Sequence, residues 1–274
     1  MLTARQQHCL RGIGIQVWSE RGSAPGDRLA TGSVAAVAES EQGVPETGDR
    51  PGFSENASPA ASDPRQKRSQ SPVIEDPATE AAEAKSTNPP VLDSWDQIID
   101  AIHACSACEL SQNCTQKVPG VGSHDARLLI VGEGPGHDED IRGEPFVGRS
   151  GQLLDRMLAA IGIARDQVYI TNIVKCRPPN NRDPKPAEAQ ACRSYLDAQI
   201  RQLAPRVILS VGRVSAHNLL GSNQPVGKLI QQMHQLPGTD IPVKVTYHPA
   251  YLLRNPSAKA IAWQDLKLLH QLLQ

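Results

Sequence analysis

The chain has 274 residues, of which 39% are hydrophobic and 21% charged, with a formal net charge of −1 at pH 7. This length allows one large domain, or one medium domain with additional sequence. The balanced charge excludes a strongly basic protein, so charge alone does not indicate nucleic-acid binding. No stretch has the length of a membrane span, and the N-terminus lacks the apolar region of a signal peptide. We therefore expect a cytoplasmic protein with no membrane partner.

The N-terminal third differs from the remainder in composition. Residues 1–20 hold five apolar side chains between Leu10 and Trp18, which is typical of a short element that packs loosely on a domain or docks onto a partner protein. Residues 21–92 are rich in Ala, Ser, Pro, Gly and Glu. Because such a segment cannot bury enough surface to offset its ordering entropy, we predict a long disordered linker.

Residues 93–274 carry the pattern of a single folded domain. Ser94 is a candidate N-cap, and Ile98 and Ile102 follow at helical spacing. Four apolar runs have the length and composition of buried parallel strands, namely residues 128–131, 168–173, 207–211 and 243–247. Helical patterns separate these runs. The alternation predicts a three-layer α/β/α domain with a central, four-stranded, mostly parallel sheet.

Polar side chains follow three of the predicted strands. Glu133 comes directly after the first strand, Asn172 lies toward the end of the second, and His248 follows the fourth. In open parallel sheets, ligands bind beyond the carboxyl ends of the strands. The sequence therefore predicts a site at which these three residues converge.

The loop after the first strand is rich in glycine and acidic residues. It reads Gly-Glu-Gly-Pro-Gly from Gly132 to Gly136, and an acidic run follows at residues 138–140 with no lysine. A phosphate-binding loop requires a different glycine spacing, and the P-loop also requires a lysine. A phosphate among these carboxylates would be repelled. The loop suits a neutral ligand, or one that gains positive charge during a reaction; the alternative is a tight, solvated turn.

The cysteine spacing indicates a metal centre. Cys105 and Cys108 form a Cys-x-x-Cys pair, and Cys176 and Cys192 follow at a distance. In a reducing compartment this pattern indicates a metal more often than a disulfide. Spacing alone leaves zinc and an iron–sulfur cluster as equal alternatives. Cys114 is a substitute ligand or a free thiol, and Cys9 has no evident role.

Three separated segments resemble the signature motifs of the family 4, iron–sulfur uracil-DNA glycosylases. They read GEGPGHDEDIRGEPFVGRSGQLLD, YITNIVKCRPPNNRDP and HPAYLLR, and the resemblance covers the chain from about Cys105 to Gln274. It implies a structural [4Fe–4S] cluster, an iron–sulfur cluster loop and a monomeric enzyme. The implied cluster ligands are Cys105, Cys108, Cys176 and Cys192.

The resemblance implies a monofunctional glycosylase that hydrolyses the N-glycosidic bond of uracil in DNA and starts base-excision repair. Uracil-containing DNA would be its partner, and the N-terminal segment would bind a repair or replication protein. A known crosslinking branch carries a basic insertion after the phenylalanine segment, which this chain lacks. Two alternatives remain open: a glycosylase for another deaminated base, such as hypoxanthine, and a non-catalytic iron–sulfur protein that binds nucleic acid.

The resemblance also assigns the residues that contact the base. Phe146 would stack on the flipped uracil, Asn172 would pair with its N3–H and O4, and His248 would face O2 and stabilise the departing anion. The backbone of Glu133, Gly134 and Pro135 would approach the base.

The catalytic carboxylate is assigned less directly. Gly134 stands where the best-known uracil glycosylases have an aspartate that orients water, and where family 4 usually has alanine. We therefore expect Glu139 to position the water or stabilise the oxocarbenium ion, with Asp140 as the alternative. Glu133 would instead brace the loop. Gly136 stands where other branches have a bulky residue that excludes the thymine methyl group.

A second set of residues is expected to contact DNA. The segment Leu252, Leu253 and Arg254 resembles the loop that enters the minor groove with a leucine wedge. Further cations in the Cys176–Cys192 segment are either phosphate contacts or solvated surface charges, namely Arg177, Arg182 and Lys185.

Overall fold

The computed structural model describes residues 92–274, together with residues 7, 11, 12 and 14. The expected N-terminal element in residues 1–20 and the expected linker in residues 21–92 therefore lie almost wholly outside the described residues. No helix in the described part of the chain is long and apolar enough to cross a membrane.

A six-stranded sheet with the order β1-β3-β2-β4-β6-β5 forms the centre of the fold. Its strands are β1 (Val121–Gly122), β2 (Leu128–Gly132), β3 (Tyr169–Asn172), β4 (Val207–Val211), β5 (Met233–Gln235) and β6 (Pro242–Thr246). The four predicted strands are the central ones, and they are parallel. The predicted number of strands was wrong, because β1 and β5 add to the two edges in antiparallel orientation. These edge strands are too short to give a periodic signal.

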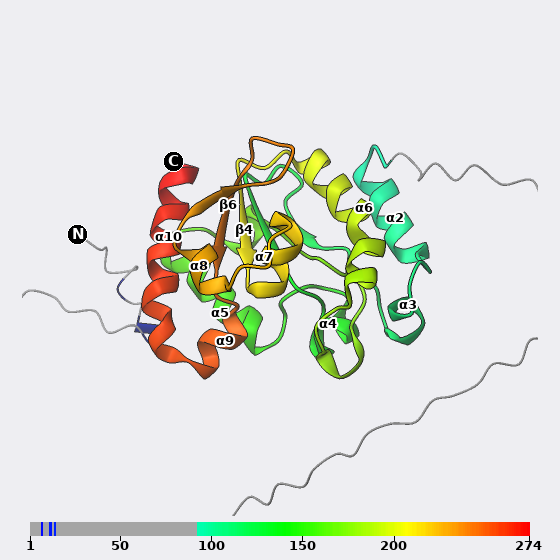
Figure 1. Cartoon of the computed structure of the whole chain (residues 1–274), viewed down its shortest axis with the longest axis horizontal. Coiled ribbons are helices and arrows are strands. Elements are labelled where there is room, and N and C mark those ends of the chain that lie inside the picture. The colour runs from blue at the N-terminus through cyan, green and yellow to red at the C-terminus, as the bar shows by residue number, and fades with distance from the viewer. Residues whose placement is uncertain (1–6, 8–10, 13, 15–91) are drawn as a thin grey trace, which may run out of the picture. The chain divides into compact units, whose positions relative to one another are not determined.

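Helices cover both faces of the sheet and confirm the three-layer prediction. Their bounds are α2 (Trp95–Ala104), α3 (Leu110–Asn113), α4 (His137–Arg142), α5 (Arg149–Ala160), α6 (Pro186–Leu203), α7 (Arg213–Leu220), α8 (Val226–Ile230), α9 (Pro249–Arg254) and α10 (Lys259–Leu273). Leu128 and Ile130 of β2 pack with α5, α9 and α10, whereas Leu129 and Val131 pack with α6. This alternation is that of a strand buried on both faces. Figure 1 shows α10 on one side of the strands and α6 with α2 on the other.

Helix α2 begins where the sequence predicts. The Ser94 hydroxyl accepts a hydrogen bond from the backbone N–H of Gln97 at 3.3 Å, which caps the helix. Ile98 and Ile102 are fully buried in a cluster with Ala198 of α6. Cys105 is the C-cap of the helix. Because α2 packs on α6, Cys105 is held beside the helix that carries Cys192.

Candidate active site

A cavity of about 470 Å³ opens beyond the carboxyl ends of β2, β3 and β6. Its lining contains most of the residues that the sequence assigned to the base and the reaction, namely Glu133, Gly134, Pro135, Glu139, Phe146, Asn172, His248 and Arg254. The structure thus brings together side chains that lie more than 100 residues apart in the chain. Parallel strand order accounts for this, because it places these strand ends at one edge of the sheet.

Asn172 presents an unpaired amide oxygen to this cavity. The residue is 2% exposed, and its Oδ1 has no hydrogen-bond partner among the described residues. Asn172 pairs with Gly132 of β2. A Cβ at Gly132 would lie 2.4 Å from that Oδ1 and 2.7 Å from ring carbons of Phe146. Glycine is therefore required here, and the buried acceptor is costly unless a ligand donates to it.

Phe146 is held in a strained backbone conformation against the cavity. Its φ is +54°, which is a rare value for a bulky residue and is found at functional sites. A Cβ at Gly151 of α5 would lie 1.8 Å from the Phe146 carbonyl oxygen, so the helix approaches closely only because it has glycine there. The ring stacks against His248 with centroids 5.7 Å apart and an interplanar angle of 29°.

His248 is fixed in one tautomer and is neutral at physiological pH. It is the N-cap of α9, and its Nδ1 accepts a hydrogen bond from the backbone N–H of Ala250 at 3.1 Å. The neutral ring therefore carries its proton on Nε2. Burial, together with the Arg254 guanidinium, lowers the pKa of His248 from 6.5 to about 4, although the Glu139 carboxylate acts in the opposite direction.

Glu139, rather than Glu133, is the carboxylate that braces the glycine-rich loop. One oxygen of Glu139 accepts backbone N–H groups of Val147 and Gly148 at 2.9 and 3.1 Å, and the other accepts that of Gly136 at 3.1 Å. A Cβ at Gly136 would lie 2.6 Å from this second oxygen. The glycine there thus makes room for the brace.

Asp140 points away from the cavity. Its Oδ1 accepts backbone N–H groups of Thr115 and Gln116 at 2.8 and 3.3 Å, and it is 3% exposed. Its role is to hold the segment after α3 against α4.

Glu133 faces the cavity and has an unusually high pKa. Burial, and then the neighbouring carboxylate of Asp183, raises the pKa of Glu133 from 4.5 to about 7, while Arg213 opposes the shift. Arg213 also pairs with Asp183. Sequence reasoning missed both partners, because Asp183 lies in a loop 50 residues further along the chain and Arg213 begins α7, 80 residues further along. No local spacing connects either residue with Glu133.

Five cysteines gather where α2, α3 and α6 meet the strand ends. Cys176 and Cys192 are buried, and Cys108 and Cys114 pack against the same core cluster. Burial raises the pKa of Cys176, with Cys114, Cys192 and Cys108 adding to the shift, and the pKa of Cys192 is raised in part by Cys108 and Cys105. Within residues 92–274, no group of three or more His, Cys, Asp or Glu side chains has a geometry that holds a metal ion. The donor set, which consists of neighbouring thiols, fits the chemistry of iron–sulfur ligation.

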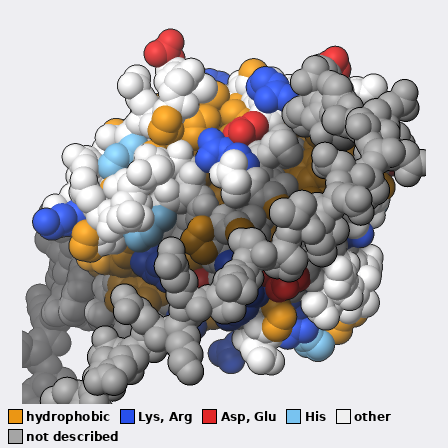
Figure 2. Space-filling model, turned by 45° about the vertical axis from the view of Figure 1, so that its right-hand side comes forward, with side chains coloured by type: hydrophobic (Ala, Val, Ile, Leu, Met, Phe, Trp, Pro, Cys, Tyr) orange, Lys and Arg blue, Asp and Glu red, His pale blue; other side chains and the backbone are white. Residues whose placement is uncertain are grey.

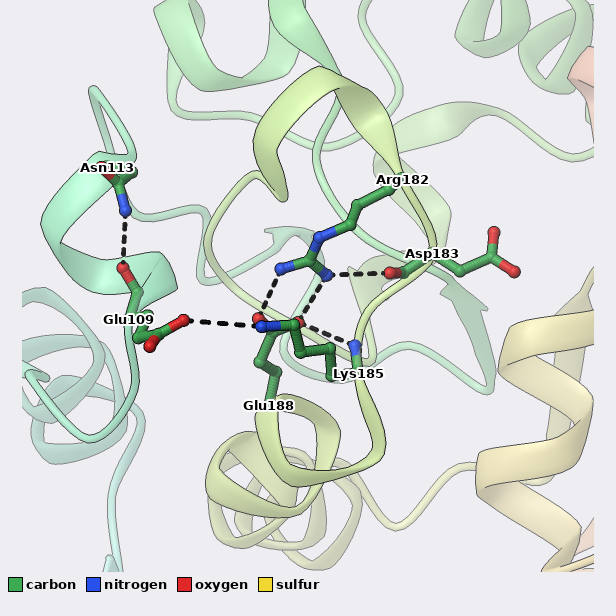
Figure 3. Close-up of polar contacts among 6 residues, drawn as sticks. All are labelled: Glu109, Asn113, Arg182, Asp183, Lys185 and Glu188. Carbon is green, nitrogen blue, oxygen red and sulfur yellow. Dashed lines mark hydrogen bonds and ion pairs between the residues drawn. The ribbon is translucent and has the colours of Figure 1, made fainter. Parts of the chain in front are cut away.

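One ion pair joins the two cysteine-bearing segments, and a second lies within the later segment (Figure 3). Arg182 donates to both oxygens of Glu188 at 2.6 and 2.8 Å, and Lys185 pairs with Glu109 at 3.6 Å. Glu109 follows Cys108 directly, and the other three residues lie between Cys176 and Cys192. The Arg182 guanidinium is therefore occupied by its ion pair with Glu188, and the Lys185 side chain is more exposed than that of Arg182.

The residues expected to contact DNA are divided between core and surface. Leu252 is 1% exposed and packs in the main core cluster, whereas Leu253 is 38% exposed and Arg254 is exposed beside the cavity. Only Leu253 of the two leucines is thus placed to enter a groove. On the face that Figure 2 shows, Lys and Arg side chains lie among Asp, Glu and His side chains.

Comparisons with known proteins agree with this geometry. Residues 119–267 match the model of the uracil DNA glycosylase superfamily. The type-4 uracil-DNA glycosylase of Archaeoglobus fulgidus is 41% identical over 187 residues, which cover 66% of this chain and 94% of that protein. The type-4 enzyme of Thermotoga maritima is 44% identical over 174 residues, which cover 62% of this chain and 90% of that protein. This chain therefore belongs to the uracil DNA glycosylase superfamily, and within it to the type-4 uracil-DNA glycosylases.

Proposed function

We infer that this protein is a hydrolase that cleaves the N-glycosidic bond of uracil in DNA and so starts base-excision repair. The observation that carries this inference is the buried, unpaired Asn172 Oδ1, which shares a cavity with the Phe146 ring and the neutral His248. The similarity to type-4 uracil-DNA glycosylases supports the same substrate.

Recognition of the base follows from the polar edge of Asn172. The unpaired Oδ1 suits the N3–H donor of uracil, and the amide nitrogen suits the O4 acceptor. Cytosine has no proton on N3 and an amino group at position 4, so both contacts would fail. A buried site that hydrogen-bonds one base rejects its mispaired analogue strongly, because its own groups are then left unpaired. The Phe146 ring would stack on the flipped base.

Departure of the base leaves negative charge on uracil and positive charge on the sugar. The proton on Nε2 of the neutral His248 can hydrogen-bond O2 of the leaving uracil and stabilise the anion there. A neutral imidazole does so without repelling the cationic sugar. The Glu139 carboxylate, fixed by three backbone N–H groups, contributes negative charge near His248.

Glu133 and Glu139 have different roles in the attack of water on the sugar. Both oxygens of Glu139 accept hydrogen bonds from the loop, so this side chain is poorly placed to accept a proton from water. Its negative charge can still stabilise the oxocarbenium ion. Glu133 has no backbone partner of this kind, and its pKa of about 7 suits a group that accepts a proton from water. We therefore assign positioning of the water to Glu133 and charge stabilisation to Glu139.

The four cysteines of the resemblance are proposed to hold a [4Fe–4S] cluster. Cys105 and Cys108 would contribute from the end of α2, and Cys176 and Cys192 from the segment after β3. The cluster would join the two segments covalently, in addition to the ion pair between Lys185 and Glu109 (Figure 3). Protein purified without oxygen should contain about four irons and four sulfides per chain, and stoichiometric zinc would contradict the proposal.

Contacts to DNA are proposed for Leu253 and Arg254 beside the cavity mouth. A partly exposed leucine can fill the space that a flipped base leaves, and the guanidinium can bind a flanking phosphate.

The decisive test is release of uracil from an oligonucleotide. Anaerobically purified protein is incubated with single- and double-stranded oligonucleotides that contain uracil, hypoxanthine, thymine or cytosine at one position. We expect alkali-sensitive abasic sites with uracil and none with thymine or cytosine. Strand cleavage without alkali would contradict a monofunctional enzyme, and absence of uracil release from cluster-containing protein would refute the function.

A further inference from the structure

Lys175 is a buried lysine that the proposed mechanism does not use, and burial lowers the pKa of its amino group from 10.5 to about 7. The residue is 1% exposed. In the chain it lies three residues after Asn172, the last residue of β3, and directly before Cys176. Burying an ammonium group is unfavourable unless it is fully hydrogen-bonded. A lysine in this place therefore requires a structural or functional reason.

Three neutral oxygens surround the Lys175 ammonium. Nζ donates to Thr171 Oγ1 at 2.6 Å, to the Asn172 carbonyl oxygen at 2.9 Å and to Gln199 Oε1 at 2.8 Å. The three donors of the ammonium thus have three acceptors. Two of these acceptors belong to the last two residues of β3, so the side chain folds back over the strand that presents the base-reading amide.

Two of these acceptors, Thr171 and Gln199, also donate hydrogen bonds. Gln199 donates to the Pro119 carbonyl oxygen at 2.8 Å, and Thr171 donates to the same oxygen at 2.8 Å. The backbone carbonyl of Lys175 accepts from Val118 N–H at 2.7 Å. The network is closed, and it joins β3, α6 and the segment before β1 around one ammonium group.

The backbone of Lys175 also contacts the cysteine cluster. Lys175 is bonded directly to Cys176, which packs with Cys192 in one buried cluster. One residue therefore connects a cysteine of the proposed cluster, through its backbone, with the carbonyl of Asn172, through its side chain. Movement of the cysteine segment would be transmitted to the residue that recognises uracil.

We propose that Lys175 is a positioning residue for uracil recognition, which acts through Asn172. It fixes the backbone at the end of β3, so that the Asn172 amide stays aimed into the cavity although its Oδ1 has no protein partner. An unpaired buried amide would otherwise turn toward any available donor. This inference rests on the proposed function.

A double-mutant cycle tests the proposal. Single-turnover uracil excision is measured for the full-length, cluster-containing wild type, Lys175→Met, Asn172→Ala and the double variant. Loss of the three hydrogen bonds that Lys175 Nζ donates corresponds to a decrease of about 10- to 100-fold for Lys175→Met alone. If Lys175 acts through Asn172, the same substitution lowers excision by less than about threefold when Asn172 is already alanine, because the two effects are coupled.

Lys244 provides a matched control. Lys244 of β6 is also buried, but its ammonium pairs with Asp265 of α10 at 2.8 Å rather than with β3. Lys244→Met is expected to lower the melting temperature and to leave excision per folded molecule unchanged at lower temperature. Equal losses of excision in the two methionine variants would overturn the proposal.

A second variant covers the case in which Lys175→Met does not fold. Thr171→Val removes one Nζ acceptor with a side chain of the same shape, and it enters the same cycle with Asn172→Ala. Additive effects in the cycle overturn the role of Lys175 while the function stands. A wild-type protein that releases no uracil refutes the function itself.

Discussion

At the scale of single residues, burial shifts the pKa values of two cavity side chains in opposite directions. It lowers the pKa of His248 to about 4 and raises that of Glu133 to about 7. In both cases burial disfavours the charged form. The consequence is a neutral histidine over the whole physiological range and a carboxylate that changes charge within it.

His248→Ala should lower uracil excision by about 100- to 1,000-fold, which is the usual effect of losing a donor to a developing anion. Affinity for undamaged DNA should stay the same, since the ring lies inside the cavity. Because the folded pKa is about 4, His248 should contribute no inflection to the wild-type rate between pH 5 and 8. Single-turnover rates and a DNA-binding titration measure both effects. Wild-type turnover in the alanine variant would remove His248 from the mechanism.

Glu133→Gln should remove an inflection from the pH profile. If its carboxylate accepts a proton from water, wild-type kcat/KM should rise as the pH increases through about 7. The glutamine variant should be slow and nearly independent of pH in that range, and Glu139→Gln should keep the inflection.

Glu133 affects the pH dependence of stability in the direction opposite to its effect on the rate. The unfolded carboxyl ionises near 4.5 while the folded one holds its proton to about 7, so the wild-type free energy of unfolding should fall as pH rises between these values. Glu133→Gln should weaken that fall in denaturant titrations. An unchanged slope would show that the Glu133 pKa is not raised.

Sequence reasoning identified residues that meet in one cavity, but it did not find the neighbouring groups that hold the two carboxylates there. Phe146, Asn172 and His248 follow from motifs and strand ends. The roles of Glu133 and Glu139 depend instead on which backbone N–H groups lie within reach, and on Asp183. Such contacts form between segments that are distant in sequence, so no local pattern could assign them.

At the scale of elements, the loop from β2 to α5 is shaped by close backbone approaches. Gly132, Gly136 and Gly151 each stand where a Cβ would come within 2.7 Å of a site residue. The sequence showed that the loop is rich in glycine, but the reason for each glycine is visible only in the packed structure. The central strands were predictable because they are continuous apolar runs, and the edge strands were not.

Gly151→Ala should be strongly destabilising. The added Cβ would lie 1.8 Å from the Phe146 carbonyl oxygen, and backbone cannot yield as a flexible side chain can. We expect a loss of about 3 kcal/mol or more of unfolding free energy, the range of severe core overpacking and strain. Excision should fall as well, since Phe146 would have to move. Thermal or denaturant unfolding measures the loss.

Gly227→Ala is the matched control, because Gly227 also lies within a helix, α8, and the added Cβ would lie 3.9 Å from Tyr247 Oη, an ordinary van der Waals distance. Alanine there should stabilise the protein by about 0.5–1 kcal/mol through helix propensity. Similar losses in both variants would show that the close approach at Gly151 does not limit stability.

At the scale of the whole molecule, the cysteine segments and the sheet edge form one connected unit. Glu109 pairs with Lys185 across the two cysteine segments, and Arg182 pairs with Glu188 within the later one. Lys175 directly precedes Cys176, and its Nζ donates to the Asn172 carbonyl oxygen. The spacing of the cysteines predicted that two distant segments meet, and the structure brings them together. The salt bridges and the buried lysine could not be predicted, because charged residues in a loop most often form a solvated surface.

Removal of residues 1–91 should leave excision on naked DNA nearly intact. The A. fulgidus relative is matched over 94% of its length by 66% of this chain, and every residue assigned to the cavity or the cysteine cluster lies after residue 104. The truncation would remove the hydrogen bond from Arg156 of α5 to the Gly12 carbonyl oxygen at 3.3 Å. An exposed bond of this kind is weak, so the rate should stay within about threefold, which is less than 1 kcal/mol. Single-turnover kinetics of the two forms give the comparison. An inactive truncated protein with a normal melting temperature would instead assign the N-terminal segment to the active site.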